Sequence, residues 1–273
     1  MQRRDMISGL SIVGGALALG AGDALGAVSP APGAMLDAYR KILASTRDED
    51  TCCWYLGTMF LRLEGRPDIP VIQAETIMAY RVETVSPDQF RIDWREIGYF
   101  RDAASGEPAQ AWTNPITGVR VASPRAFAEG PGSYTLTRAA TGVDLAIVQP
   151  HARIEGADVS CRMLPNNQIA LTQSERKRRG FPQRDGTMPP AGNWAEAHTV
   201  LSFYADAKDL TQPSAPARGV YSFTLNALAP WMGFDGFAGK TIVRGIIVKA
   251  TRDEPVNTVA RQRLQAAFPS FFV

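Results

Sequence analysis

The sequence predicts a mainly β protein: a single-domain antiparallel β-barrel or strongly curved sheet of the lipocalin-like kind, with one helix at each end. Many short segments rich in β-branched and aromatic residues alternate with Gly, Pro, Asp or Asn, which is the pattern of strands joined by turns. Little helical periodicity separates these segments, and this argues against a doubly wound parallel sheet. So many short strands in one chain favour closure into a barrel. We expect residues 34–273 to form this domain.

Residues 1–27 have the order of a signal peptide. Arg3 and Arg4 precede an apolar stretch from Leu10 to Leu19, and small residues follow as far as Ala27, where a signal peptidase could cut. Adjacent arginines before an apolar pair are typical of the twin-arginine route. The alternatives are an ordinary secretory signal or an uncleaved anchor, although the apolar run is shorter than the roughly 20 residues of a membrane span. We expect the twin-arginine translocase as a partner, a periplasmic location and no stable membrane insertion.

Helical spacing marks both ends of the mature chain. After a short linker at residues 28–33, apolar residues from Met35 to Leu43 predict an amphipathic helix that ends near Ser45. Residues 256–268 repeat this spacing and predict a second helix before Pro269. Residues 180–193 predict a loop across one end of the barrel. The expected strands are 54–63, 71–85, 89–100, 119–123, 133–138, 143–154, 157–163, 168–174, 197–204, 219–225 and 241–250.

Composition excludes several classes of function. The net charge of +2 gives no electrostatic reason to expect binding to nucleic acid or to an anionic membrane surface. The sequence contains no glycine-rich phosphate loop, no G-x-S-x-G elbow, no HExxH and no CxxC, so we expect neither a cofactor nor a metal. Cys52, Cys53 and Cys161 are expected to be buried thiols, the alternative being one bridge from Cys161 to either neighbour of the adjacent pair.

His198 is the candidate acid or base. It follows Glu196 by two positions at the entrance to an expected strand, so alternation places both side chains on one face. If that face is the barrel interior, Glu196 orients the imidazole for proton transfer, with Tyr204 as a secondary donor. The alternative is a surface pair or a structural histidine in the core.

Arg91, Asp93 and Arg95 share the strand face opposite Ile92, Trp94 and Glu96. One solvated face explains this alternation most simply. In the alternative, a polar barrel interior lets Arg95 bind a substrate carboxylate, with Arg91 at the substrate site. Aromatic side chains favour an aromatic or polycyclic ligand, and the further candidate substrate contacts are Trp94, Trp112, Asn114, Trp194 and Trp231.

The run Glu175-Arg176-Lys177-Arg178-Arg179 has two interpretations. A short cluster of basic residues can bind an anion. A solvated turn explains the run more simply, and we expect that.

Two stretches carry a resemblance to a known family. The first is Arg95–Glu96–Ile97–Gly98–Tyr99–Phe100 with Ser105–Gly106–Glu107–Pro108 and Trp112–Thr113–Asn114–Pro115–Ile116–Thr117–Gly118; the second is Ala229–Pro230–Trp231–Met232–Gly233–Phe234, followed by Phe268–Pro269–Ser270–Phe271. Over most of the mature chain the sequence resembles the bacterial and fungal family called domain of unknown function 1838. That family implies no settled activity, and its W-x-N-P-x-T-G motif is also explained as a hairpin turn begun by Asn114.

These observations lead to three hypotheses. The first is an exported, cofactor-independent lyase or isomerase that acts on a small aromatic or lipophilic substrate, with a substrate carboxylate as one option. The second is a periplasmic binding protein of the lipocalin kind that holds a hydrophobic ligand unchanged. The third is a metal-dependent enzyme, for which two histidines and scattered carboxylates give weak support.

Overall fold

The computed structural model describes residues 30–47, 49–123, 126–181, 188–234, 237–250 and 257–271. The predicted signal peptide at 1–27 lies outside these residues. The helices are α1 (Pro32–Leu43) and α2 (Thr258–Ala267), with short 3-10 turns η1 (Ala191–Asn193), η2 (Ala207–Thr211), η3 (Pro230–Met232) and η4 (Pro269–Phe271). The strands are β1 (Thr51–Leu63), β2 (Ile69–Ser86), β3 (Gln89–Arg101), β4 (Ala111–Thr113), β5 (Arg120–Ala122), β6 (Phe127–Arg138), β7 (Val143–Val148), β8 (Ala152–Met163), β9 (Gln168–Arg179), β10 (Ala195–Asp206), β11 (Arg218–Leu225) and β12 (Gly239–Ala250).

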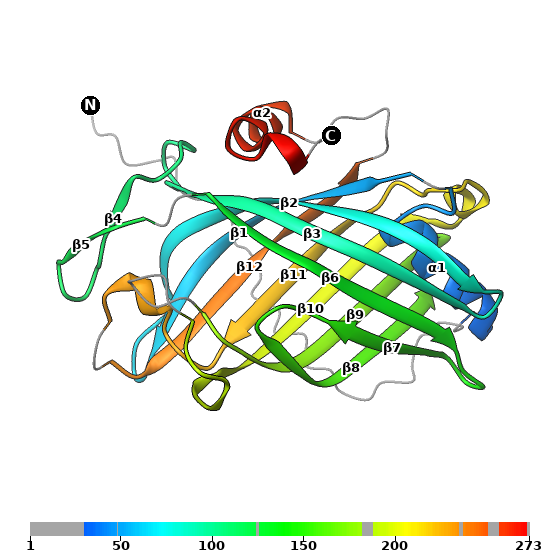
Figure 1. Ribbon diagram of the computed structural model, residues 1–273, viewed down its shortest axis with the longest axis horizontal. Coiled ribbons are helices and arrows are strands. Elements are labelled where there is room, and N and C mark those ends of the chain that lie inside the picture. The colour runs from blue at the N-terminus through cyan, green and yellow to red at the C-terminus, as the bar shows by residue number, and fades with distance from the viewer. Residues whose placement is uncertain are drawn as a thin grey trace, which may run out of the picture.

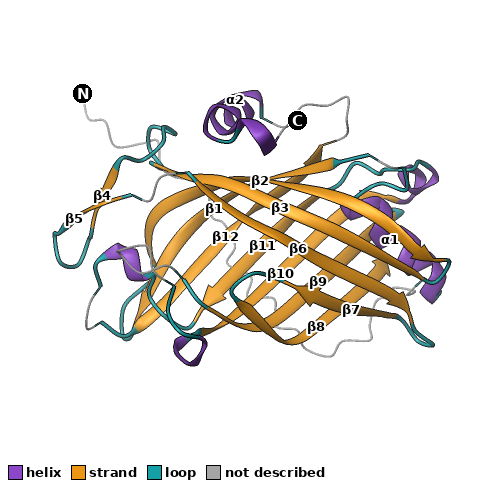
Figure 2. Ribbon diagram, viewed as in Figure 1, coloured by secondary structure: helices purple, strands orange, loops and turns teal. Residues whose placement is uncertain are grey.

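Ten strands form one antiparallel sheet in the order β7-β6-β3-β2-β1-β12-β11-β10-β9-β8. Each strand pairs with its neighbour in the meander, and β12 returns to pair with β1. The two edge strands, β7 and β8, are consecutive and lie side by side, so the sheet curls into a nearly closed barrel (Figure 1). The structure thus confirms the predicted single-domain, barrel-like β architecture with one helix near each terminus of the chain (Figure 2).

Alternation decides which side chains face inward. In β1, the positions from Thr51 to Leu63 alternate between buried and less buried, as the period of two in a strand requires. The register then fixes the inner face of the neighbouring strands: Tyr55 pairs with Thr76 on β2 and with Ile247 on β12. The barrel interior is therefore defined residue by residue around the sheet.

Helix α1 closes one end of the barrel. Pro32, within the predicted linker, begins the helix, since proline lacks the N–H that a first turn leaves unpaired. The side chains of Tyr39 and Ile42 are fully buried in the largest core cluster. The Lys249 ammonium donates hydrogen bonds to the carbonyls of Lys41 and Ala44 at the C-terminal end of α1, where a cation is favoured.

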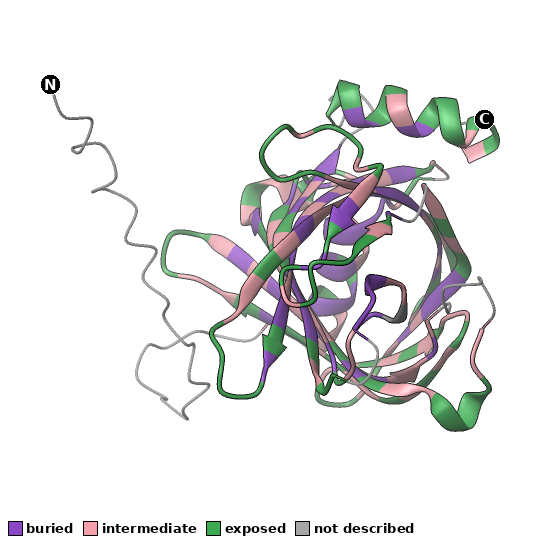
Figure 3. Ribbon diagram, turned by 90° about the vertical axis from the view of Figure 1, so that its left-hand side faces the viewer, coloured by how far each residue is buried: buried purple, intermediate pink, exposed green. Residues whose placement is uncertain are grey.

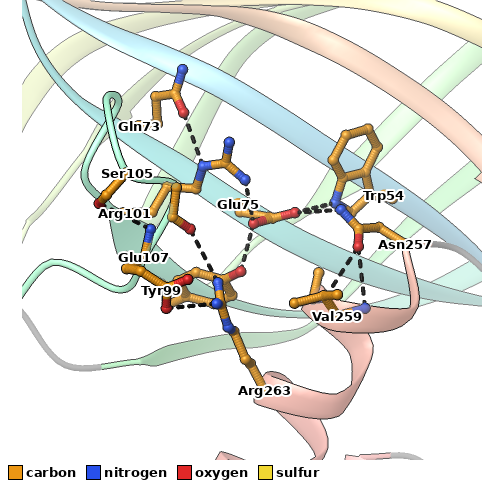
Figure 4. A network of polar contacts seen from close by, with 12 residues as sticks. Trp54, Gln73, Glu75, Tyr99, Arg101, Ser105, Glu107, Asn257, Val259 and Arg263 are labelled. Carbon is orange, nitrogen blue, oxygen red and sulfur yellow. Dashed lines mark hydrogen bonds and ion pairs between the residues drawn. The ribbon is translucent and has the colours of Figure 1, made fainter.

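Helix α2 packs on the outside of the barrel, and much of its own surface stays exposed (Figure 3). Its anchor is the buried carboxylate of Glu75, which accepts hydrogen bonds from Trp54 Nε1 at 2.8 Å and from the Tyr99 hydroxyl at 2.5 Å (Figure 4). Arg101 and Asn257 add donors at 2.9 and 3.2 Å. Glu75 thus connects the helix cap to the sheet.

Two strand predictions were wrong in detail. The expected strand at 143–154 is interrupted, because a turn with His151 at φ 53° separates β7 from β8. The segment expected as a barrel strand at 119–123 contains β5, which pairs with β4 in a separate hairpin between β3 and β6. Cys52, Cys53 and Cys161 are free thiols, and the last two are buried.

Candidate functional site

A cavity of about 780 Å³ lies at the end of the barrel opposite α1. Its wall is mostly apolar, because strands from around the barrel turn large side chains inward at this level. The lining includes Met59, Phe100, Phe127, Phe181, Phe223, Leu225 and Trp231.

Tyr221 lies between this cavity and the core around α1, since it packs against the α1 cluster and against a second cluster that contains Met59 and Trp112. Its ring lies across two glycines that face each other on β1 and β12, Gly57 and Gly245. A Cβ at Gly57 would stand 2.0 Å from the Tyr221 hydroxyl oxygen, and one at Gly245 would stand 2.5 Å from its ring. The two glycines therefore make room for the Tyr221 ring between the core and the cavity.

A partly buried ion pair lies in the apolar wall. Arg179 on β9 pairs with Glu129 on β6, and both side chains are less than one-fifth exposed (18% and 17%). The Arg179 guanidinium also lies 4.9 Å from the ring centre of Phe181, and Gln149 Nε2 donates to Glu129 at 3.0 Å. Both charged groups line the cavity.

A chain of hydrogen bonds leads from this ion pair to α1 along the inner face of β9. Lys177 Nζ donates to Gln149 at 2.7 Å and to Glu175 at 2.8 Å. Gln173 Nε2 donates to Glu175 at 2.6 Å, and Gln173 Oε1 accepts a hydrogen bond from the Tyr39 hydroxyl. The polar groups inside the barrel are thus connected from the plugged end to the cavity.

Glu96 lies next to the ion pair. It pairs in register with Glu129 across β3 and β6, and alternation turns its side chain inward, on the same face as buried Trp94. Burial and the nearby charge of Glu129 raise the pKa of Glu96 to about 7, although Arg179, Lys177 and a hydrogen bond with Thr76 act in the opposite direction. Glu96 can therefore gain or lose a proton near neutral pH.

Glu129 behaves differently from its neighbour. Burial acts to raise its pKa, but the charge and hydrogen bond of Arg179 and the hydrogen bond from Gln149 outweigh burial, so the pKa of Glu129 is lowered. Two neighbouring carboxyls thus have pKa values that are pushed apart. Such a pair can supply one acid and one base.

The predicted catalytic residues of β10 lie on the outer face of the barrel. His198 and Glu196 do share a face, but both are exposed, as is Tyr204. Glu196 accepts a hydrogen bond from Asn226 at 3.1 Å and pairs with Arg178 at 3.6 Å. The inward positions of this strand belong to residues such as Ala197 and Leu201, both buried.

The predicted arginines also face outward. Arg91 is exposed and pairs with Asp93 at 2.8 Å. The Arg95 guanidinium, also exposed, lies 5.6 Å from the ring centre of Phe271. The solvated-face interpretation of these residues therefore matches their surroundings.

The remaining predicted substrate contacts divide between core, turns and cavity. Trp94 points inward but stacks against Tyr134 in the core. Asn114, fully buried, accepts hydrogen bonds from two backbone amides of its own turn and donates to the carbonyls of Met232 and Gly233. Trp112 is buried beside Trp231, and the Trp194 indole donates to the carbonyl of Pro189 at 3.0 Å. Of the predicted contacts, Trp231 lines the cavity.

The predicted turn at residues 175–179 is wrong, and several charged residues of the site belong to this run. It belongs to β9, where Glu175 and Lys177 are buried while Arg176 is exposed. The alternation of buried and less buried positions continues upstream to Gln173. This period of two in the sequence is the signal that could have indicated a strand with Glu175 and Lys177 on its inner face. Glu129 and Glu96 carried no comparable signal, since their pairing depends on the register of distant strands.

No family model matches the chain, and no curated protein matches it. Within the part of the chain that the structure describes, no group of three His, Cys, Asp or Glu residues could hold a metal ion, and no helix is long and apolar enough to cross a membrane.

Proposed function

We propose that this protein binds a lipophilic small molecule inside the barrel. The observation that carries the proposal is the apolar cavity of about 780 Å³ at the end opposite α1. Cavities of several hundred Å³, mostly apolar and with a few polar groups, are typical of small-molecule sites. The Glu129–Arg179 pair supplies those polar groups and fixes the orientation of the ligand.

Release of ordered water from the aromatic wall favours an apolar ligand. Burying apolar ligand surface contributes about 25 cal/mol per Å². Phe100, Phe223 and Trp231 come from three different parts of the chain, so a planar molecule can contact several rings at once.

A titration with the neutral fluorophore Nile red tests the proposal. Leu225 is buried and lines the cavity, whereas Val220 on the same strand is half-exposed on the outer face. We expect saturable one-to-one binding to the wild type and to Val220→Trp, and at least about tenfold weaker binding to Leu225→Trp, which fills the cavity. Equal binding to all three proteins would exclude the cavity as the site.

A second candidate function is that of a lyase or isomerase which moves a proton on the bound molecule. The observation that favours it is the Glu96–Glu129 pair, in which Glu96 has a pKa of about 7 and Glu129 a lowered pKa. A group with a pKa near the working pH is the most effective general acid or base. For an identified substrate, Glu96→Gln should reduce kcat by about 100-fold or more while KM changes little.

We also propose export by the twin-arginine route and a function in the periplasm. The adjacent Arg3 and Arg4 before an apolar stretch support this. Replacing both with lysine should keep the protein in the cytoplasmic fraction. Unchanged export of that variant would instead support an ordinary secretory signal.

A further inference from the structure

We propose that the cavity selects its ligand by charge, and that the preferred ligand is an apolar molecule carrying a protonated amine. The inference rests on the proposed binding function and names the class of ligand. It differs from the option of a substrate carboxylate that the sequence raised.

The argument begins with the balance of charge at the cavity end of the barrel. The described interior residues here include the carboxyls Glu96, Glu129 and Glu175, and the cations Lys177 and Arg179. Lys177 pairs with Glu175 at 2.8 Å, and Arg179 pairs with Glu129. Glu96 is thus left without a cation of its own among these groups.

A buried carboxyl without a cation either holds a proton or attracts a positive charge. The other groups that face Glu96 do not compensate this excess of one negative charge. Thr76 contributes a hydrogen bond, and the neighbouring tyrosines are neutral hydroxyls whose pKa values burial raises further. The titratable and charged groups around Glu96 are Glu129 from β6, Lys177 and Arg179 from β9, Tyr55 from β1, Tyr134 from β6 and Tyr221 from β11, with Glu175 further along β9.

A ligand ammonium can neutralise this excess negative charge. Glu129 lines the cavity and Glu96 is its direct neighbour across the sheet, so an ammonium beside Glu129 also lies in the field of Glu96. A ligand carboxylate would face both glutamates. It would gain Arg179 only by displacing Glu129, whose carboxylate would then lose its cation.

Among the described charged side chains of the cavity wall, the cation that could favour an acceptor group is Arg179, whose Nε has no hydrogen-bond partner. This atom is enclosed by protein. A ligand therefore does not reach Nε, and an anion that approaches the rest of the guanidinium has to compete with Glu129.

Three ligands with the same naphthalene ring and different polar groups test the proposal. Isothermal titration calorimetry compares the affinities of 1-naphthylmethylamine, 1-naphthylmethanol and 1-naphthoate. The titrations are run at about pH 8, where histidines are ordinarily neutral and alkylamines are protonated. We expect the amine to bind about tenfold or more tightly than the alcohol, and the carboxylate to bind more weakly than the alcohol.

Two variants assign the effect to the named groups, with circular dichroism as the check of folding. Glu96→Gln should bring the amine to within about threefold of the alcohol. Glu129→Gln frees Arg179 and should shift the preference toward the carboxylate.

The outcomes separate the two proposals. Equal affinities for the three ligands, a tighter carboxylate, or an amine preference that survives Glu96→Gln would overturn the charge selection and leave the binding proposal standing. If none of the three ligands binds to the folded protein, both proposals fail.

Discussion

Glu96 on β3 pairs in register with Glu129 on β6, and both side chains lie on the inner wall of the barrel. One of these carboxyls has its own arginine and the other does not. Because two partly buried carboxyls on neighbouring strands cannot both ionise freely, the pair makes the barrel interior sensitive to pH and to the charge of a ligand.

The first prediction concerns the pH dependence of stability. The pKa of Glu96 is about 7 in the folded protein and near its ordinary value of 4.5 in the unfolded chain. The folded state therefore binds more protons between these values, and the contribution of Glu96 to stability is lost as pH rises through this window. Relative to the wild type, Glu96→Gln should gain about 1–3 kcal/mol in free energy of unfolding from about pH 4.5 to pH 7. Urea unfolding across this range measures it, and a constant difference would contradict the raised pKa.

The plug formed by α1 gives a second prediction. Ile42 is fully buried in the largest core cluster, so Ile42→Ala should lower the free energy of unfolding by about 2–5 kcal/mol. Val259 on α2 is half-exposed, and Val259→Ala should change it by less than about 0.5 kcal/mol. Similar effects in chemical denaturation would mean that α1 does not contribute to the core as described.

The third prediction concerns the attachment of α2 to the barrel. Glu75 is 1% exposed and accepts hydrogen bonds from four side chains, Trp54, Tyr99, Arg101 and Asn257. Glu75→Ala leaves Trp54, Tyr99 and the partly buried Arg101 without their shared acceptor and should cost about 3–5 kcal/mol. Asn257→Ala removes one of these donors and the helix N-cap, and should cost about 1–2 kcal/mol.

Hydrogen exchange locates the effect of these two variants. Both should speed exchange of the amides of α2 (Thr258–Ala267), while exchange in β9 is unaffected by Asn257→Ala. Unchanged protection of α2 in Glu75→Ala would show that the helix is held by its apolar contacts alone.

The fourth prediction uses fluorescence. Trp231 lines the cavity, and Trp54 lies outside the barrel beside α2. A ligand in the cavity should change the emission of Trp231 and not that of Trp54, because only the former is in contact range. Trp231→Phe should therefore abolish most of the ligand-induced change, and Trp54→Phe should preserve it. The reverse result would place the ligand on the outer surface.

The fifth prediction concerns the exposed face of β10. His198 is exposed and lies on the side of the sheet away from the cavity. His198→Ala should leave Nile red affinity unchanged within about twofold and stability within about 0.5 kcal/mol. A large loss of binding would show that His198 contributes to the ligand site.

The barrel and both helices could be predicted from the sequence because they depend on local periods. Apolar residues from Met35 to Leu43 repeat at helical spacing, and the positions of β1 alternate in burial. Chain closure was also predictable in kind, since a meander of many short strands must pair its free edges.

The site could not be predicted, because alternation shows which side chains share a face and not which face is inside. His198 and Glu196 were correctly placed on one face, yet that face is the outer one. The Glu96–Glu129 pair depends on the register of β3 with β6 across an inserted hairpin. Such a register is set by tertiary packing, so no local pattern could reveal it.

The location of a bound ligand tests the central claim most directly. A crystal structure of the protein with 1-bromonaphthalene, recorded at the bromine absorption edge, identifies the ligand by its anomalous signal. We predict one strong bromine peak inside the barrel, between Phe100, Phe223 and Leu225. Bromine peaks confined to the outer surface, with none in the cavity, would contradict the assignment of this barrel as a binding protein.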